Sequence, residues 1–295
     1  MGIGFWLLVA AAGAVGQFID AVSGMGFGAF SASVMLAGGI APAVVVATVN
    51  IAKIGSGAAS AASHWKFGNV RRQWIVPLAV SGIAGGVLGA LLLTSGLGDF
   101  FGRWMPWILL GIAFLILRRF LFPSATLPLP RISGGAEDSV PASVSQERAR
   151  YGVSGPAWFR KTWIRAGFIK WVRLQPDTFG LAVIGFGAGL INALSGAYGP
   201  FATSAVMLTK QTPPRFAVGT VNFVEVAVAG AVSVTLLMRA DLSQMSWQMP
   251  LALIAGAVVT APLGAYLTRR LPAKTIGIAV AVTMIALNVT SLVRR

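Results

Sequence analysis

The sequence predicts an all-α protein that crosses a membrane several times, and three observations carry this prediction. Hydrophobic residues make up 56% of the 295-residue chain. Charged residues make up only 11%, against about 25% in ordinary soluble domains. Long uncharged apolar stretches recur, at residues 74–95, 104–117, 248–268 and 275–293.

These apolar stretches predict helices rather than strands. Inside a bilayer every backbone polar group must find its partner within the protein, which leaves helices and closed barrels as the spanning structures. The stretches are too long and too continuous for the alternating strands of a barrel. At the length needed to cross a bilayer, the chain has room for about 8–10 membrane segments.

An internal repeat organises the chain. Shifting residues 20–54 by 172 positions places them on residues 192–226 without a gap. The matches include polar residues inside apolar runs: Asp20-Ala-Val-Ser-Gly falls on Asn192-Ala-Leu-Ser-Gly, Thr48-Val-Asn falls on Thr220-Val-Asn, and Pro42 falls on Pro214. We therefore predict two homologous halves, a pattern typical of membrane transporters.

Each half is predicted to start with a helix pair interrupted by glycine and to continue with three unbroken helices. The second members of the pairs, at about 27–39 and 200–210, are too short to span, which favours re-entrant or broken helices. The charges at the ends of the apolar segments leave open whether the halves are parallel or inverted.

The predicted domains are a first transmembrane repeat at 1–121, a basic linker at 122–179 and a second transmembrane repeat at 180–295. Ten of the 23 Lys and Arg residues lie at 118–179. Loops rich in Lys and Arg stay in the cytoplasm, so we expect a cytoplasmic linker in a bacterial inner membrane protein. Aromatic and basic residues mix at 157–173, which predicts an interfacial helix in contact with lipid or, alternatively, a plain loop. The basic residues form no dedicated binding domain, so no nucleic-acid partner is expected.

The first candidate binding feature is the pair of glycine-rich helix breaks. A break exposes backbone N–H groups at the start of a half-helix, where the partial positive charge favours an anion. Equivalent breaks in two halves point to a transporter's binding site. The alternative is that small residues only allow close helix packing, as we expect for Gly85, Gly86 and Gly89. The candidate substrate-binding residues here are Ser23, Gly24, Met25, Gly26, Phe27, Gly28, Ser195, Gly196, Tyr198 and Gly199.

A second candidate feature is a set of polar residues within segments made otherwise of small apolar residues. It comprises Thr48, Asn50 and Lys53, matched at the same shift by Thr220, Asn222 and Glu225. Charged residues inside a membrane usually face a cavity or a partner. The pattern predicts either a Lys53–Glu225 ion pair or a proton-linked site. The candidate anion-binding residues here are Lys53, Asn50, Thr220 and Asn222. Alternatively, the asparagines only join helices by hydrogen bonds.

Asp20 is a further candidate for proton coupling, together with Glu225. Its equivalent in the second half is the neutral Asn192, so the charge of Asp20 is not needed for a structural role that both halves share. The alternative is that Asp20 lies near a helix end, where it is solvated or caps the helix. The sequence has no Walker-type loop, no HExxH motif and no cysteine. We therefore expect no enzyme, no cofactor and no metal site, and a gradient as the energy source.

The duplicated glycine breaks around Ser23-Gly24 and Ser195-Gly196, followed by Pro42 and Thr48-Val-Asn50, resemble the TauE/SafE family of sulfite and organosulfonate exporters. The resemblance covers nearly the whole chain apart from the linker. It implies a secondary transporter that exports a small sulfur-containing anion, such as sulfite or sulfoacetate, coupled to protons and working by alternating access. An anion channel, a permease for another small organic anion and a membrane subunit without flux of its own are the alternatives. The chain departs from the family pattern in its long basic linker and in Tyr198 and Pro200.

Overall fold

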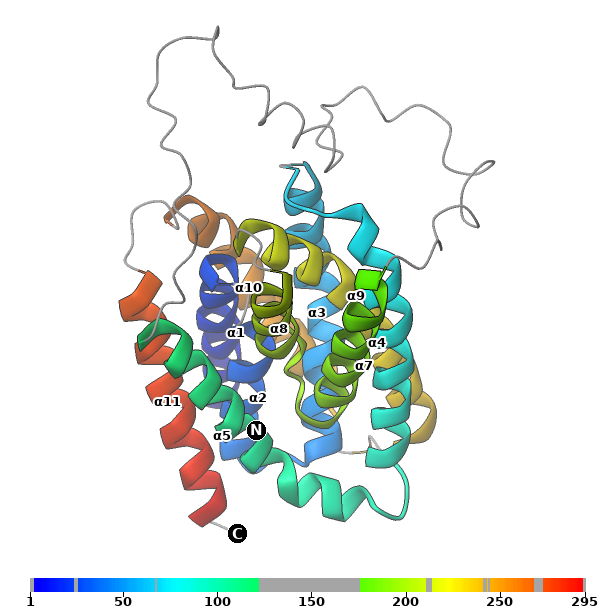
Figure 1. Cartoon of the computed structure of the whole chain (residues 1–295). Helices are drawn as coiled ribbons and strands as arrows, with labels where there is room; N and C mark the ends of the chain where they lie inside the picture. Colours follow the sequence, from blue (N-terminus) through cyan, green and yellow to red (C-terminus); the bar gives the residue numbers. More distant parts are fainter. Residues whose placement is uncertain are drawn as a thin grey trace, which may run out of the picture.

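The computed structural model describes residues 3–23, 26–66, 68–121, 176–210, 214–240, 243, 245–267 and 273–293. Ten α-helices are formed by these residues: α1 (Ile3–Ser23), α2 (Phe27–Ala37), α3 (Pro42–Lys66), α4 (Arg72–Leu93), α5 (Gly98–Leu121), α7 (Pro176–Ser195), α8 (Tyr198–Lys210), α9 (Pro214–Arg239), α10 (Gln248–Leu267) and α11 (Ala273–Val293). Together they form one bundle (Figure 1). Most of the predicted linker, including the interfacial segment at 157–173, lies outside the described residues, and α7 begins at Pro176, before the predicted boundary.

The predicted all-α membrane architecture is confirmed. Among the described residues, six helices are long and apolar enough to cross a bilayer: α1, α3, α4, α5, α7 and α9. The outer surface of the bundle is apolar as well, because side chains such as Val80, Phe114, Phe179 and Val259 are more than half exposed. A surface of this kind suits a lipid environment rather than water.

Both helix pairs are broken where the sequence predicts it. Helix α1 ends at Ser23 and α7 ends at Ser195, and a short helix of 11 or 13 residues follows each break. The next helices, α3 and α9, both have proline as their first residue. Proline is favoured there because its fixed φ suits a helix start and its missing N–H would have no helical partner.

The two halves interlock rather than pack as separate bodies. Helix α1 packs mainly on α10 of the other half, and α4 packs mainly on α7. These contacts are so close that a Cβ on Gly189 would lie 2.0 Å from the carbonyl oxygen of Gly82, and one on Gly256 would lie 2.0 Å from that of Ala10. Gly85, Gly86 and Gly89 of α4 likewise face α7 or α9, as the packing interpretation of these glycines expects.

The contacts also give the relative direction of the halves. Lys53 of α3 meets Glu225 of α9, and Asn69, just after α3, lies against Gly219 of α9, so residue numbers rise along one segment as they fall along the other. Helices α3 and α9, which match at the 172-residue shift, are therefore antiparallel. The charge pattern left the choice between parallel and inverted halves open, and the structure has the inverted one.

Candidate functional site

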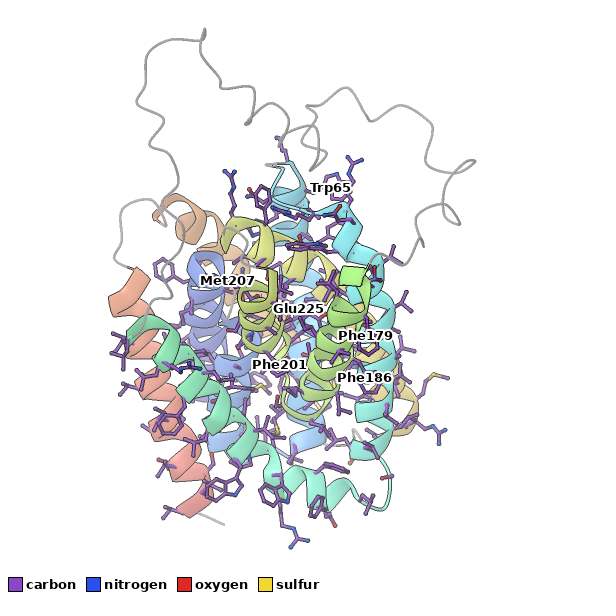
Figure 2. All side chains as sticks on the ribbon, in the orientation of Figure 1. Trp65, Phe179, Phe186, Phe201, Met207 and Glu225 are labelled. Carbon is purple, nitrogen blue, oxygen red and sulfur yellow. The ribbon has the colours of Figure 1, made fainter. Side chains whose placement is uncertain are left out.

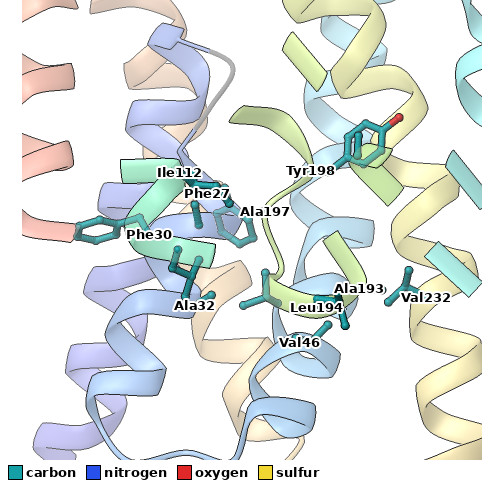
Figure 3. Packing of buried hydrophobic residues seen from close by; sticks show 14 of the residues in the cluster. Phe27, Phe30, Ala32, Val46, Ile112, Ala193, Leu194, Ala197, Tyr198 and Val232 are labelled. Carbon is teal, nitrogen blue, oxygen red and sulfur yellow. The ribbon is translucent and has the colours of Figure 1, made fainter. Parts of the chain in front are cut away.

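The two helix breaks meet in the interior of the bundle. The backbone carbonyl of Gly196 lies so close to Gly28 that a Cβ on Gly28 would be 2.0 Å from it. Figure 3 shows Phe27 and Ala197 at this junction. Gly196 has a φ of 76°, a left-handed conformation that residues with a Cβ rarely adopt. The glycines of the two halves thus place the two breaks in direct backbone contact.

Lys53 lies at this junction, midway along α3. Its side chain is almost completely buried, with 4% of the residue exposed. The ammonium donates to the carbonyl oxygen of Gly196 at 2.9 Å, to Asn192 Oδ1 at 3.3 Å and to Glu225 Oε1. An ammonium has three hydrogens to donate, so all three have protein acceptors.

The predicted ion pair between Lys53 and Glu225 is present. Glu225 lies midway along α9 and is 8% exposed, and Figure 2 shows it inside the bundle. Removing two charges from water costs several kcal/mol per ion, which their attraction and further hydrogen bonds must offset. The bonds from Lys53 to Asn192 and Gly196 supply part of this compensation.

Asp20 lies in the last turn of α1, and its carboxylate reaches the start of α2. Its Oδ1 accepts a hydrogen bond of 3.1 Å from the backbone N–H of Gly26, the residue that caps this helix. A carboxylate at a helix start is favoured by the helix dipole. The capping role that the sequence left as an alternative for Asp20 is therefore real, although the residue it caps belongs to the next helix.

A small pocket adjoins these charges. Asp20 and Phe27 line it together with Lys53 and Glu225. The remaining lining residues, from α1, α3 and α9, are Gln17, Ser56, Gly57, Ser60, Asn222 and Val226. All three ionisable side chains that the sequence placed inside the membrane thus face one space.

Asn222 is the pocket residue with unused hydrogen-bonding capacity. It is 3% exposed, and its Nδ2 donates a long bond of 3.4 Å to Ser60 Oγ. Its Oδ1 has no partner among the described residues. A buried amide oxygen without a partner loses the hydrogen bonds it would make in water, which makes it a group that a ligand could satisfy.

Several predicted binding residues lie elsewhere. Asn50 bonds Asn192 at 2.7 Å and the carbonyl of Val46 at 2.9 Å, so it joins helices, as the alternative interpretation had it. The Ser195 hydroxyl bonds the carbonyl of Ile191 in its own helix. Tyr198 is fully buried, and its hydroxyl lies next to Gly82 of α4 rather than in the pocket.

The other predicted residues do not contribute to the pocket or lie outside the described part of the chain. Thr48 and Gly199 are buried and do not line the pocket. Gly24 and Met25 lie outside the described residues, and so does the side chain of Ser23.

Sequence reasoning missed Gln17, Ser56, Gly57 and Ser60. A signal was available, because residues three or four apart lie on the same side of a helix. Gln17 is three residues before Asp20, and Ser56 and Ser60 lie three and seven residues after Lys53. They continue the polar faces on which the charged residues lie.

Aromatic and arginine side chains pack together beyond Ser60, at the end of α3. Trp65 stacks on Phe223 with 5.1 Å between ring centroids. The Arg71 guanidinium lies over Trp74 at 4.9 Å and over Phe216 at 4.7 Å. Thr220, predicted as a binding residue, accepts the Arg71 backbone N–H at 2.9 Å, so it belongs to this cluster.

Fold and site together define a polytopic helical membrane protein of the transporter class, with charged residues at the meeting point of broken helices. The chain belongs to the sulfite exporter TauE/SafE family, whose model matches residues 9–290. It is 29% identical over 282 residues to the "Probable membrane transporter protein YtnM" of Bacillus subtilis (strain 168), covering 95% of this chain and 80% of that protein. It is also 36% identical over 100 residues to the "Probable membrane transporter protein ORF9" of Sinorhizobium sp, covering 34% of this chain and 38% of the relative. No solved structure matches the chain significantly.

Proposed function

We propose that this membrane transporter exports a small sulfur oxyanion, sulfite or an organosulfonate such as sulfoacetate, across a bacterial inner membrane and that this export is coupled to protons. The family supports the sulfur oxyanion. The single observation that supports an anionic substrate is the buried Lys53 ammonium, which lies between the two helix breaks on the wall of the pocket. The start of α2 adds a second positive feature to the same wall.

The small size of the pocket supports a small substrate. Besides the charged groups, its wall offers the hydroxyls of Ser56 and Ser60 and the unpartnered amide oxygen of Asn222. Hydroxyls and amides can bond the oxygens of sulfite or a sulfonate. Phe27 provides the apolar contact for the short carbon chain of an organosulfonate.

The orientation in the membrane follows from the positive residues. Lys66 at the end of α3 and Arg71 and Arg72 at the start of α4 lie at one end of the bundle, the end toward which α5 runs before the linker sequence begins (Figure 1). At the opposite end, α5 begins with Asp99 and Arg103 in its first two turns, and α9 ends at Arg239. The positive-inside rule then places the linker end in the cytoplasm.

The pocket lies on the cytoplasmic side of the ion pair in this orientation. Its residues on α3 run from Lys53 toward the C-terminal end of the helix, through Ser56 and Gly57 to Ser60. On the other side of the pair, α3 is sealed by Val44, Val45, Val46, Ala47 and Val49, each at most 2% exposed. We take this as the cytoplasm-facing state of an alternating-access cycle, in which the two inverted halves rock about the junction.

The experiment is ligand-dependent thermal stability of the purified protein. A ligand that binds only the folded state raises the apparent melting temperature. The panel is sulfite, sulfoacetate, taurine, thiosulfate, sulfate and acetate. We expect stabilisation by one or two sulfur oxyanions that is lost in Lys53→Ala and kept in Arg103→Ala, an exposed cation at the far end of the bundle.

A response to acetate alone would replace the sulfur oxyanion by another organic anion, and no response to any anion would overturn the proposal. Flux into proteoliposomes separates transporter from channel. Saturation with anion concentration and dependence on a proton gradient are expected. A linear, proton-independent flux would identify a channel.

A further inference from the structure

We infer that Asp20 is the proton carrier of this transporter and that its carboxylate occupies the position of the substrate anion at the start of α2. This inference rests on the proposed function and deepens it, because the sequence left Asp20 and Glu225 as equal candidates for proton coupling. The structure separates the two acids by what each one binds.

Glu225 is committed to Lys53. Both residues lie at the middle of their helices, and Lys53 has no hydrogen left after bonding Glu225, Asn192 and Gly196. Protonating Glu225 would leave a buried ammonium without its counter-charge, which is strongly unfavourable. Glu225 therefore stays charged to hold Lys53.

Asp20 is bound to a group that an external anion could bind equally well. Its Oδ1 accepts the N–H of Gly26, the residue that caps the start of α2, and the first turn of α2 contains no acidic residue of its own. The start of an 11-residue helix is a site of positive potential for any carboxylate, sulfite or sulfonate oxygen. The unpartnered Asn222 oxygen, in a residue only 3% exposed, lies on the wall of the same pocket and also calls for a ligand.

The charges of the pocket imply that the ionised Asp20 carboxylate and the substrate anion cannot both be bound at the start of α2. Among the described residues, those facing Asp20 across the pocket are Lys53 from α3 and Glu225 from α9, while Gln17 of α1 and Phe27 of α2 are neutral. With both acids ionised the pocket carries two negative charges and one positive charge. An anion that entered would meet net negative charge and find the Gly26 N–H already bonded.

One proton removes both obstacles. Protonation of the Asp20 carboxylate brings the pocket to net zero, and a neutral carboxyl group is a weaker acceptor for the Gly26 N–H than a substrate oxyanion. The anion then takes the place of the carboxylate. When the proton leaves Asp20 on the opposite side, the carboxylate regains the helix start and releases the anion. One proton therefore moves with each anion and in the same direction, so the concentration gradient of the anion itself drives outward transport.

The second half has no carboxylate at the position equivalent to Asp20. The residue equivalent to Asp20 is Asn192, whose amide bonds Lys53 and Asn50 instead of the start of α8. Asparagine at this position is thus accepted by the fold in the other half of the chain. Asp20→Asn is the matched variant, since it removes the charge and keeps the size and the capping oxygen.

The test is anion flux in proteoliposomes with a trapped pH indicator, using the anion that stabilises the wild-type protein. Wild type should move protons together with the anion. Asp20→Asn should still exchange anion for anion but move no protons, and its flux should ignore an imposed pH gradient. Asp20→Glu should keep proton movement, because it retains the carboxylate.

A second measurement covers an Asp20→Asn protein that is too slow to transport. Anion affinity of the wild type, followed by thermal stability, should fall by about tenfold per pH unit once Asp20 is ionised. In Asp20→Asn the affinity for a sulfonate, whose own charge stays constant near neutral pH, should be the same at every pH. Proton movement in Asp20→Asn, or a pH-dependent affinity equal to that of wild type, would overturn the inference, as would loss of anion binding at every pH. Absence of anion binding and flux in the wild type would instead refute the proposed function.

Discussion

Lys53 and Glu225 lie at equivalent positions of the two halves, 172 residues apart, and their side chains form an ion pair at the centre of the antiparallel α3–α9 contact. The lysine of the first half faces the glutamate at the equivalent position of the second half, where α3 and α9 pack against each other. The opposite charges at this position therefore bind the two halves to each other, and both side chains also line the pocket.

The first prediction concerns this pair. Lys53→Met leaves Glu225 buried without a counter-charge, so we expect a loss of about 3–5 kcal/mol in the free energy of unfolding. Lys53→Met combined with Glu225→Met should regain most of that loss, because two apolar side chains need no charge compensation. Denaturation in detergent measures both effects. A double variant as unstable as the single one would contradict the interpretation, and neither variant should bind the anion.

Gly28 gives a second prediction. A Cβ at this position would lie 2.5 Å from Lys53 Nζ as well as 2.0 Å from the Gly196 carbonyl oxygen. Gly28→Ala must therefore push the two helix breaks apart, with an overpacking cost of about 1–3 kcal/mol. We expect anion binding and transport to be lost along with stability. Gly230→Ala is the control, since nothing lies within 4 Å of its added Cβ.

A third prediction separates packing glycines from site glycines. Gly189 of α7 touches the Gly82 carbonyl of α4, away from the pocket. Gly189→Ala should lower the melting temperature, while the folded fraction should bind the anion with wild-type affinity. Titration of the purified variant at low temperature checks this. Reduced affinity at full folding would show that the α4–α7 contact takes part in binding.

Much of the fold could be predicted because membrane helices can be recognised in the sequence as continuous runs of apolar residues. The ends of α1 and α7 at Ser23 and Ser195 fall at the predicted breaks. The relative direction of the halves could not be predicted. It depends on which helices pack together, and the sparse charges at the helix ends fitted either arrangement.

The site was predictable in its charges and less so in its hydroxyls and amides. A charged residue in an apolar segment has few stable positions, so Lys53, Glu225 and Asp20 were found to share one space. Asparagine and tyrosine can instead be satisfied by neighbouring helices, and Asn50 is. Ser56 and Ser60 escaped because serine is common in such helices and shows its role only by its spacing from Lys53.

Tyr198 supplies a fourth prediction. Its hydroxyl is buried beside Gly82 and has no hydrogen-bond partner among the described residues. Tyr198→Phe removes this unpaired group and keeps the ring, so the stability should be unchanged or slightly raised. Anion affinity should stay at the wild-type value in the same thermal titration. Weakened binding would mean that the hydroxyl reaches the substrate in another state of the cycle.

The fifth prediction uses the absence of cysteine from the chain, which makes any introduced thiol unique. Ser60 lines the half-buried outer part of the pocket on the side that we place in the cytoplasm. Ser60→Cys should react with a membrane-impermeant thiol reagent only in inside-out vesicles, and the bound anion should slow the reaction. Leu97, 55% exposed between α4 and α5 at the other end, should give the reverse sidedness as Leu97→Cys.

Ser33→Cys is the buried control for this experiment. Ser33 is fully buried and receives a 2.9 Å hydrogen bond from Asn288 of α11, so its thiol should stay unreactive from both sides. Reaction of Ser60→Cys in right-side-out vesicles alone would invert the proposed orientation, and with it the direction in which the pocket loads. In the state described here, the buried residues of α3 between its start and Lys53 block access from the side opposite the cytoplasm. Reaction from both sides would therefore mean that the transporter alternates between inward-facing and outward-facing states without added substrate.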